Sequence, residues 1–179
     1  MTTIRYQTFP RTELPPHFAK KVAEVFIKHE KAISTELLSK GLTSDFVLKQ
    51  IRDDLELIGF NCEKGKHISG KINRPISFGE NGKPEVNYDI DAYQSEWKAV
   101  LEVEAARAWM GNAVYRDLIR ACVMAETEVL ILAVPNKYKY KSSGHETVDG
   151  GYIHARGLAD VLYGHGSFRL PYKLLLIGY

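Results

Sequence analysis

The sequence predicts a single α/β domain, with a mixed central sheet flanked by helices and a mainly helical N-terminal segment. Three observations favour this fold class. Apolar residues recur at helical spacing within residues 1–58, residues 88–93 and 100–104 alternate with the period of a β-strand, and residues 128–134 are almost continuously apolar. Strands that alternate with helical segments are the order expected of an α/β protein.

Two helices are predicted in the N-terminal segment. Pro15 and Pro16 open the first, which runs to about His29. Ser44 is the predicted N-cap of the second, and Gly59 ends it. Their buried stripes are predicted to be Phe18, Val22, Val25 and Phe26 in the first helix and Leu48, Ile51, Leu55 and Ile58 in the second.

A short strand at residues 60–63 is expected to follow the second helix. Residues 64–85 are rich in Gly, Lys, Asn and Pro and have poor periodicity, so loops or short strands are expected there. A basic, flexible segment at this point fits two roles, tracking a DNA backbone or presenting ordinary solubilising side chains. Its basic residues are Lys64, Lys66, His67, Lys71 and Arg74.

The two alternating segments carry paired acids. Asp89 and Asp91 lie on one face of the first segment, and Glu102 and Glu104 lie on one face of the second. A hairpin would place Asp91 opposite Glu102 and Asp89 opposite Glu104, so that four carboxylates share one patch. Directly opposed like charges destabilise a sheet. Such a patch needs raised pKa values or a bound cation, and we interpret it as a metal site.

This pairing depends on a turn at residues 95–98, which places Gln94 opposite Ala99. A slip of one residue would send the acids of one strand to the other face. The residues predicted to face the core in this register are Ile90, Ala92, Leu101 and Val103.

Two other interpretations of the acids remain open. They fit the solvated face of an amphipathic hairpin, which is what most alternating strands present to water. An Asp-x-Asp pair also fits a nucleotide-sugar transferase that holds a metal on a diphosphate. That class, however, leaves the second acidic strand unexplained.

The rest of the chain predicts a helix, a central strand, a second helix and a closing strand. The central strand is the apolar run at residues 128–134, and the closing strand covers residues 172–177. The second helix covers residues 152–162. The predicted buried stripes are Val114, Leu118, Ile119, Cys122 and Val123 in the first helix and Ile153, Leu158, Val161 and Leu162 in the second.

At its acidic segments the chain resembles the PD-(D/E)xK nuclease superfamily, most closely restriction endonucleases of the BamHI and BglII type. Asp91 and Glu102 match the first two motif positions. Glu104 stands where the motif has Lys, and members of the BamHI and BglII group carry Glu or Gln there. The proline that names the superfamily is not adjacent to the motif Asp, because Pro84 lies several residues upstream. The resemblance covers about residues 45–135 and implies a restriction-endonuclease-like core within residues 60–179.

This resemblance implies a DNA endonuclease that depends on Mg²⁺ or Mn²⁺, in its most specific form a restriction-type homodimer acting on double-stranded DNA. Asp91, Glu102 and the carbonyl of Val103 would hold the metal, with Asp89 as an accessory ligand. Glu104 would orient or deprotonate the attacking water, or hold a second metal, in place of Lys. The missing Lys leaves an alternative open: a catalytically inactive nuclease-fold module that binds DNA or protein.

Nucleases of the resembled group often take a further acid from the helix before the first strand. Asp53 and Glu56 flank the buried stripe of that helix and are the candidates. The alternative is that both are solvated helix acids.

Basic residues near the acidic segments are candidates for contacts with nucleic acid. Residues 80–104 contain seven acids and two lysines, a net charge of −5 in a chain of net charge +2. A cluster of acids in an otherwise basic chain suits a phosphate substrate that a metal ion bridges to the carboxylates. The candidates are Arg107, Arg116 and Arg120 on a helix, and Lys137, Lys139 and Lys141 among aromatics in residues 136–145. Solvated helix arginines and a mobile surface loop are the alternatives.

Length and composition set outer limits. A chain of 179 residues that is 45% hydrophobic can bury one core, which favours a single domain over residues 1–179. No apolar run approaches the roughly 18–20 residues that span a bilayer, and no signal peptide is recognised, so a cytoplasmic protein is expected. Cys62 and Cys122 are too few for a disulfide framework or a zinc site, and Cys122 is expected to be buried and reduced.

Overall fold

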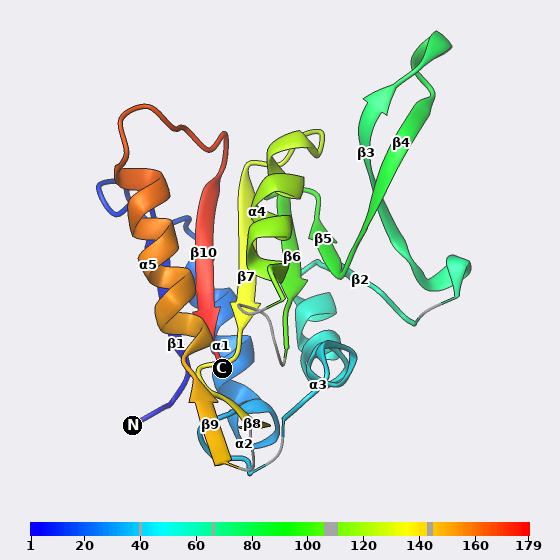
Figure 1. Ribbon diagram of the computed structural model, residues 1–179. Helices are drawn as coiled ribbons and strands as arrows, with labels where there is room; N and C mark the ends of the chain where they lie inside the picture. Colours follow the sequence, from blue (N-terminus) through cyan, green and yellow to red (C-terminus); the bar gives the residue numbers. More distant parts are fainter. Residues whose placement is uncertain (40, 66, 106–110, 143–144) are drawn as a thin grey trace.

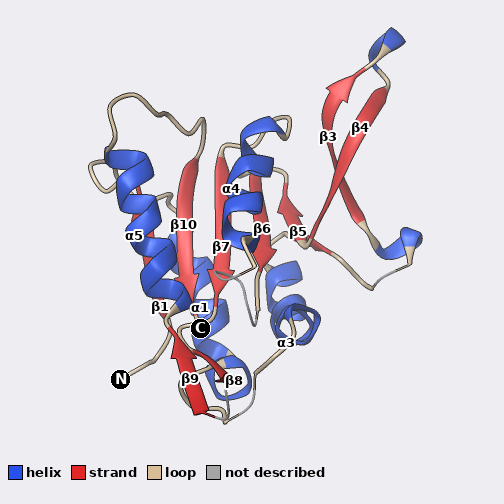
Figure 2. Cartoon of the chain, viewed as in Figure 1, coloured by secondary structure: helices blue, strands red, loops and turns tan. Residues whose placement is uncertain are grey.

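A six-stranded mixed sheet forms the centre of the molecule (Figures 1 and 2). The computed structural model describes residues 1–179 except 40, 66, 106–110 and 143–144. The three middle strands run parallel, and each outer strand is antiparallel to its neighbour. In spatial order the strands are β1 (Arg5–Phe9), β10 (Lys173–Gly178), β7 (Val129–Val134), β6 (Ala99–Val103), β5 (Ala92–Gln94) and β2 (Asn61–Cys62).

Helices cover both faces of this sheet, which confirms the predicted α/β class. One face carries α1 (Ala19–Lys28) and α3 (Ser44–Leu57), with the short α2 (Glu30–Ile33) between them along the chain. The other face carries α4 (Ala113–Val123) and α5 (Gly151–Gly164). Because both faces are covered, every residue of β7 is buried, as its apolar run predicts. Within the described residues, no helix has the length and apolar character needed to cross a bilayer.

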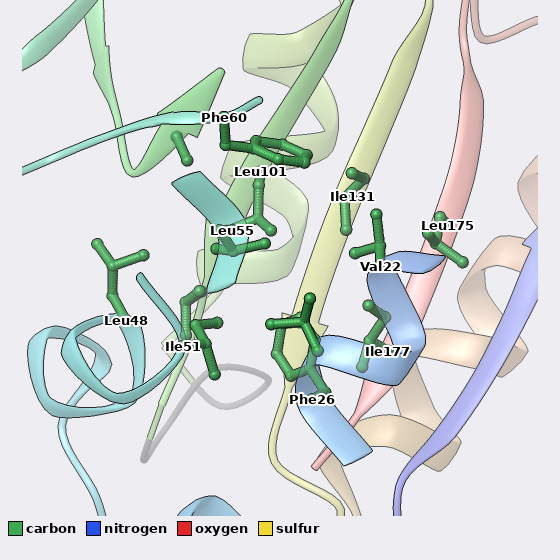
Figure 3. Packing of buried hydrophobic residues seen from close by; sticks show 14 of the residues in the cluster. Val22, Phe26, Leu48, Ile51, Leu55, Phe60, Leu101, Ile131, Leu175 and Ile177 are labelled. Carbon is green, nitrogen blue, oxygen red and sulfur yellow. The ribbon is translucent and has the colours of Figure 1, made fainter. Parts of the chain in front are cut away.

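The N-terminal helices bury the stripes predicted for them. Figure 3 shows Val22 and Phe26 of α1 packed with Leu55 of α3 over Leu101 and Ile131 of the sheet. The other predicted stripe residues of both helices are buried, except Ile58, which is partly buried. The helix that borders the acidic strands is therefore fixed by the core.

The N-cap of α3 is Thr43, one residue before the predicted Ser44. The Thr43 hydroxyl accepts a hydrogen bond from the backbone N–H of Phe46. Thr43→Ala is expected to lower the free energy of unfolding by about 1 kcal/mol, because it removes the acceptor for one orphan N–H. Urea unfolding measures this loss, and Ser44→Ala is the matched control. An equal loss in both variants would contradict the assignment of the cap.

The exposed faces of α4 and α5 were predicted wrongly. Ile119 of α4 and Val161 of α5 are exposed, at 58% and 62%. Small residues pack against the sheet in their place, among them Ala121 and Ala159. Small side chains let a helix lie close to a sheet, but large apolar residues dominate a periodicity argument. Val123 and Ile153 are also exposed, and Cys122, Leu158 and Leu162 are only partly buried. Both cysteines are free.

The predicted acidic hairpin is split between two sheets. Residues of β5 and β6 pair as predicted, with Gln94 opposite Ala99. The preceding residues, however, form β4 (Pro84–Ile90), which pairs with β3 (Ile72–Phe78) in a two-stranded arm that projects from the body (Figure 1). Asp89 therefore lies opposite Asn73 and not Glu104. The prediction failed there because the chain changes its partner strand at Asp91.

The change of partner also divides the residues that were predicted to face one core. Ala92, Leu101 and Val103 pack on the α1–α3 face, whereas Ile90 packs on the α4–α5 face. All four are buried. Ile90 thus anchors the base of the arm against the helices opposite to those that Ala92 contacts.

Three strands lie where sequence analysis expected none. The N-terminal residues form β1 at an edge of the sheet, antiparallel to β10. Residues expected to be a loop form the hairpin of β8 (Tyr138–Ser142) and β9 (His145–Asp149). The described 3₁₀ turns are Ile68–Gly70 and Glu80–Gly82, on either side of β3.

Candidate active site

The predicted catalytic acids gather at the carboxyl end of β6. Glu102 and Val103 are the last two residues of β6, Glu104 follows them, and Asp91 lies at the junction between β4 and β5. All four line one depression of about 370 Å³. The other residues around it are Ser44, Glu63, Lys71, Asp89, Ile90, Arg116 and Arg120.

Asp91 is fixed by the backbone of β6. Its Oδ2 atom accepts a hydrogen bond of 2.7 Å from the backbone N–H of Val103. Burial raises the pKa of Asp91 to about 6, and that hydrogen bond opposes the rise. The junction between the arm and the sheet therefore holds a carboxyl group that ionises near neutral pH.

Glu102 is a buried acid whose charge is poorly compensated. Glu102 is 7% exposed, and its Oε1 atom is buried without a hydrogen-bond partner. Burial, followed by the charge of Asp91, raises the pKa of Glu102 well above its ordinary value. A buried polar atom with no partner costs about 1–3 kcal/mol. Such a penalty is typical of a functional site, where a ligand supplies the missing contact.

Glu104 is held by its neighbours on both sides. The backbone N–H of Glu104 donates to the carbonyl of Ala133, and the Tyr179 hydroxyl donates to the carbonyl of Glu104. Arg116 Nη2 donates to Glu104 Oε1 at 2.5 Å. Burial and the neighbouring Asp117 carboxyl group raise the pKa of Glu104 to about 8. Its carboxyl group is therefore placed firmly and exchanges a proton near neutral pH.

Asp117 is a further acid of this site that sequence analysis did not identify. It is 0% exposed, its Oδ1 accepts from Arg116 Nε at 3.0 Å, and its Oδ2 has no partner. Arg116 thus bridges Asp117 and Glu104. The available signal was spacing, because Asp117 lies three residues after Val114 and four before Ala121, on the buried face of α4.

The other predicted acids lie at the margin or away from the site. Asp89 is exposed on the arm, where it accepts a hydrogen bond from Asn73, and it reaches only the rim of the depression. Glu56 pairs with Lys64 at 3.6 Å, and Asp53 is exposed. Two acids from this part of the chain do border the site and were not predicted. They are Glu63 and, in an adjoining cavity that shares Asp91, Asp45.

The donor set suits a hard cation that needs few protein ligands. In the described part of the chain, no three His, Cys, Asp or Glu side chains are arranged as a metal site. Mg²⁺ is usually held by one or two carboxylates together with water and substrate phosphates. Asp91 and Glu102 supply such a pair, and the unpartnered Oε1 of Glu102 is an oxygen for which the protein provides no donor. The residues therefore fit Mg²⁺ better than a caged metal.

The predicted nucleic-acid contacts are unequally placed. Arg116 and Arg120 line the depression, and the Arg120 guanidinium lies 4.9 Å from the ring centre of Tyr88. Lys137 pairs with Glu36 at 3.6 Å. Lys139 and Lys141 belong to β8, but their side chains lie outside what the structure describes, as does Arg107 altogether.

The mixed sheet with helices on both faces, together with the comparison that follows, defines a restriction-endonuclease-like fold. Comparison with solved structures shows the same class. The chain is similar to the restriction endonuclease BglII in its complex with a DNA 16-mer, with a TM-score of 0.51 and 16% sequence identity. The alignment covers 99% of this chain and 78% of that chain. At this identity the likeness concerns the fold alone. No protein-family model and no curated protein matches the sequence.

Proposed function

We propose that the protein is a metal-dependent DNA endonuclease that hydrolyses phosphodiester bonds. The observation that carries the proposal is the convergence of Asp91, Glu102 and Glu104 in one depression, with a Glu102 oxygen buried and unpartnered. The restriction-endonuclease-like fold supports it, because the solved structure of similar fold is a DNA complex. Solvated hairpin acids would not have shifted pKa values of this kind.

Asp91 and Glu102 would hold Mg²⁺ or Mn²⁺, with the carbonyl of Val103 as a further oxygen donor. The cation, when bound, would neutralise charge on the scissile phosphate and acidify the attacking water. The hydrogen bond from Val103 N–H keeps Asp91 in place for this task. Asp89 is not needed in this arrangement, because it lies on the arm and bonds to Asn73.

Glu104 would accept the proton of the attacking water. A base works best when its pKa lies near the working pH, and that of Glu104 is raised to about 8. Arg116 holds the Glu104 carboxylate from one side, which leaves its orientation fixed. This pair would stand in for the Lys that the resembled motif has at this position.

Double-stranded DNA is the proposed substrate, and restriction-type cleavage is its most specific form. Arg120, which lines the depression, would contact backbone phosphates, together with the predicted Lys137, Lys139 and Lys141. Cleavage of both strands implies a homodimer that presents two sites related by a two-fold axis.

The second candidate is a nuclease-fold module that binds DNA or protein without cleaving. It is favoured by Arg116, which pairs with both Glu104 and Asp117 where a motif Lys is absent. This candidate predicts DNA binding that depends on salt but no hydrolysis and no specific stabilisation by Mg²⁺.

Incubation with supercoiled plasmid tests the proposed activity. Wild-type protein is expected to convert the plasmid to open circular and linear forms with Mg²⁺ or Mn²⁺, and not in EDTA. Parallel incubations with single-stranded DNA and with RNA define the substrate class. Intact substrates in all three incubations would contradict the nuclease proposal.

Mg²⁺ is expected to stabilise the wild-type protein but not Asp91→Asn. Binding to the folded state at 100 times the Kd adds about 2.7 kcal/mol, or roughly 5–10 °C in Tm for a chain of this size. Asn is chosen because its oxygen can still accept the hydrogen bond from Val103 N–H. Thermal unfolding with and without Mg²⁺ measures the effect. Asp89→Asn is the matched control and should respond like the wild type, and a lost response there would make Asp89 a ligand.

A further inference from the structure

A second cavity adjoins the candidate active site. It has a volume of about 290 Å³ and shares Glu63 and Asp91 with the depression described above. Its other walls come from α3 and from the segment that follows β2. We call it the α3 pocket, and its remaining lining residues are Asp45, Leu48, Lys49, Arg52, Lys64 and Gly65. A chain-like ligand that enters the active site can therefore extend past Asp91 into this pocket.

The spacing of residues along α3 turns two cations toward the pocket. Lys49 and Arg52 are three residues apart and lie on one face of the helix. The neighbouring face carries Leu48, Ile51 and Leu55, which pack into the core (Figure 3). The cations are therefore mounted on a helix that the core holds in place.

Arg52 lacks a partner that would neutralise it. No described residue forms an ion pair or a hydrogen bond with its guanidinium, and its Nε atom is buried without an acceptor. Lys49 likewise has no ion pair among the residues that the structure describes. A half-buried arginine left without an acceptor is a site for an incoming anion.

The acids around the pocket are already compensated or have another role. Glu63 pairs with Lys71 at 2.8 Å. Lys64, which lines the pocket, pairs with Glu56 at 3.6 Å, so Lys64 contributes less free charge than Arg52. Asp91 is a proposed ligand of the cation. Asp45 also lines the pocket and has an interaction partner, so Arg52 and Lys49 carry the uncompensated positive charge of the pocket.

We propose that the α3 pocket binds a phosphate of the DNA backbone next to the scissile one, held by Arg52 and Lys49. This inference rests on the proposed nuclease function. A phosphate held there would fix the register of the substrate strand, so that the neighbouring phosphodiester lies against Asp91 and Glu102. Arg52 would act as a binding residue that positions the substrate and not as a catalytic one.

Binding of duplex DNA in EDTA tests the pocket without cleavage. Arg52→Gln is expected to weaken binding on the order of tenfold and to lower the slope of log K against log salt by about 0.9. Lys49→Gln, on an exposed residue, should lower the slope similarly, and Arg52→Lys should keep most of it. Arg169→Gln is the matched control, because Arg169 lines a cavity at the opposite end of the sheet and also has no described partner. Wild-type slopes in both Gln variants on α3 would overturn the proposal.

Inorganic phosphate separates this proposal from the nuclease function. Thermal unfolding is compared in phosphate and in chloride at equal ionic strength. The extra stabilisation by phosphate should be lost in Arg52→Gln and kept in Arg169→Gln. If the plasmid stays intact while this dependence on Arg52 holds, the nuclease function fails and the anion pocket stands. If the plasmid is cut while Arg52→Gln matches the wild type in both measurements, the pocket fails and the nuclease function stands.

Discussion

Glu102→Gln is expected to abolish most DNA cleavage while raising the Tm of the metal-free protein. The glutamine keeps the size of the side chain but removes the charge that would hold the cation. Charge stabilisation of several kcal/mol in the transition state corresponds to a loss of rate of about 10²–10⁴-fold. The gain in stability follows because burial and the nearby charge of Asp91 disfavour an ionised Glu102, and glutamine carries no charge. Relief of that burden should add about 1–3 kcal/mol, or a few degrees in Tm.

Two measurements on the same protein check this result. Initial rates of plasmid nicking with Mg²⁺ give the loss of activity, and thermal unfolding in EDTA gives the change in stability. Glu96→Gln is the matched control, since Glu96 is exposed in the turn between β5 and β6. A variant that cleaves at the wild-type rate would remove Glu102 from the site. A variant that loses both activity and stability would indicate a structural role.

The metal-free protein is expected to lose stability as the pH rises from about 4 to about 8. The pKa is raised in the folded state to about 6 for Asp91 and to about 8 for Glu104, from ordinary values of 3.8 and 4.5. At a pH between the unfolded and the folded pKa of either group, the unfolded chain has released a proton that the folded protein retains. A rise in pH therefore favours unfolding, by about 1.4 kcal/mol per pH unit for each retained proton. The contribution is complete below the unfolded pKa and is gone above the folded pKa.

Urea unfolding in EDTA at several pH values measures this dependence. Glu104→Gln should flatten the upper part of the window, between about pH 6 and 8, because Asp91 titrates below it. Saturating Mg²⁺ should reduce the loss, since the proposed cation would bind the ionised carboxylates. Glu30 and Asp54 have lowered pKa values, so their contributions change only in more acidic solution. Stability that rises from pH 5 to pH 8 in EDTA would contradict the prediction.

Sequence patterns predicted those elements whose large apolar residues face the core. The stripe of α3 and the run of β7 are examples, because bulky side chains there are buried as their spacing requires. The pairing of Gln94 with Ala99 was predictable because a four-residue turn fixes the register. The same reasoning brought Asp91, Glu102 and Glu104 together, which is the part of the site that sequence could supply.

Other features depended on tertiary contacts that no local pattern encodes. Alternation over residues 88–93 is compatible with one strand or with two, and only the presence of β3 as a partner for β4 decides between them. The buried faces of α4 and α5 depend on small residues, which carry little signal in a hydrophobic pattern. In the sequence Asp117 looks like a surface acid beside Arg116, but it is buried. Its surroundings are set by residues that are close in the fold and not in the chain.

The base of the β3–β4 arm has a consequence for how the arm and the acids communicate. Ile90, the last residue of β4, is fixed in the core and immediately precedes Asp91. Because Ile90 is held in the core, movements of the β3–β4 arm are not expected to displace the Asp91 carboxylate. A shortened hairpin that keeps this isoleucine should leave Asp91 undisturbed, whereas replacing Ile90 with alanine would let movements of the hairpin tip displace Asp91.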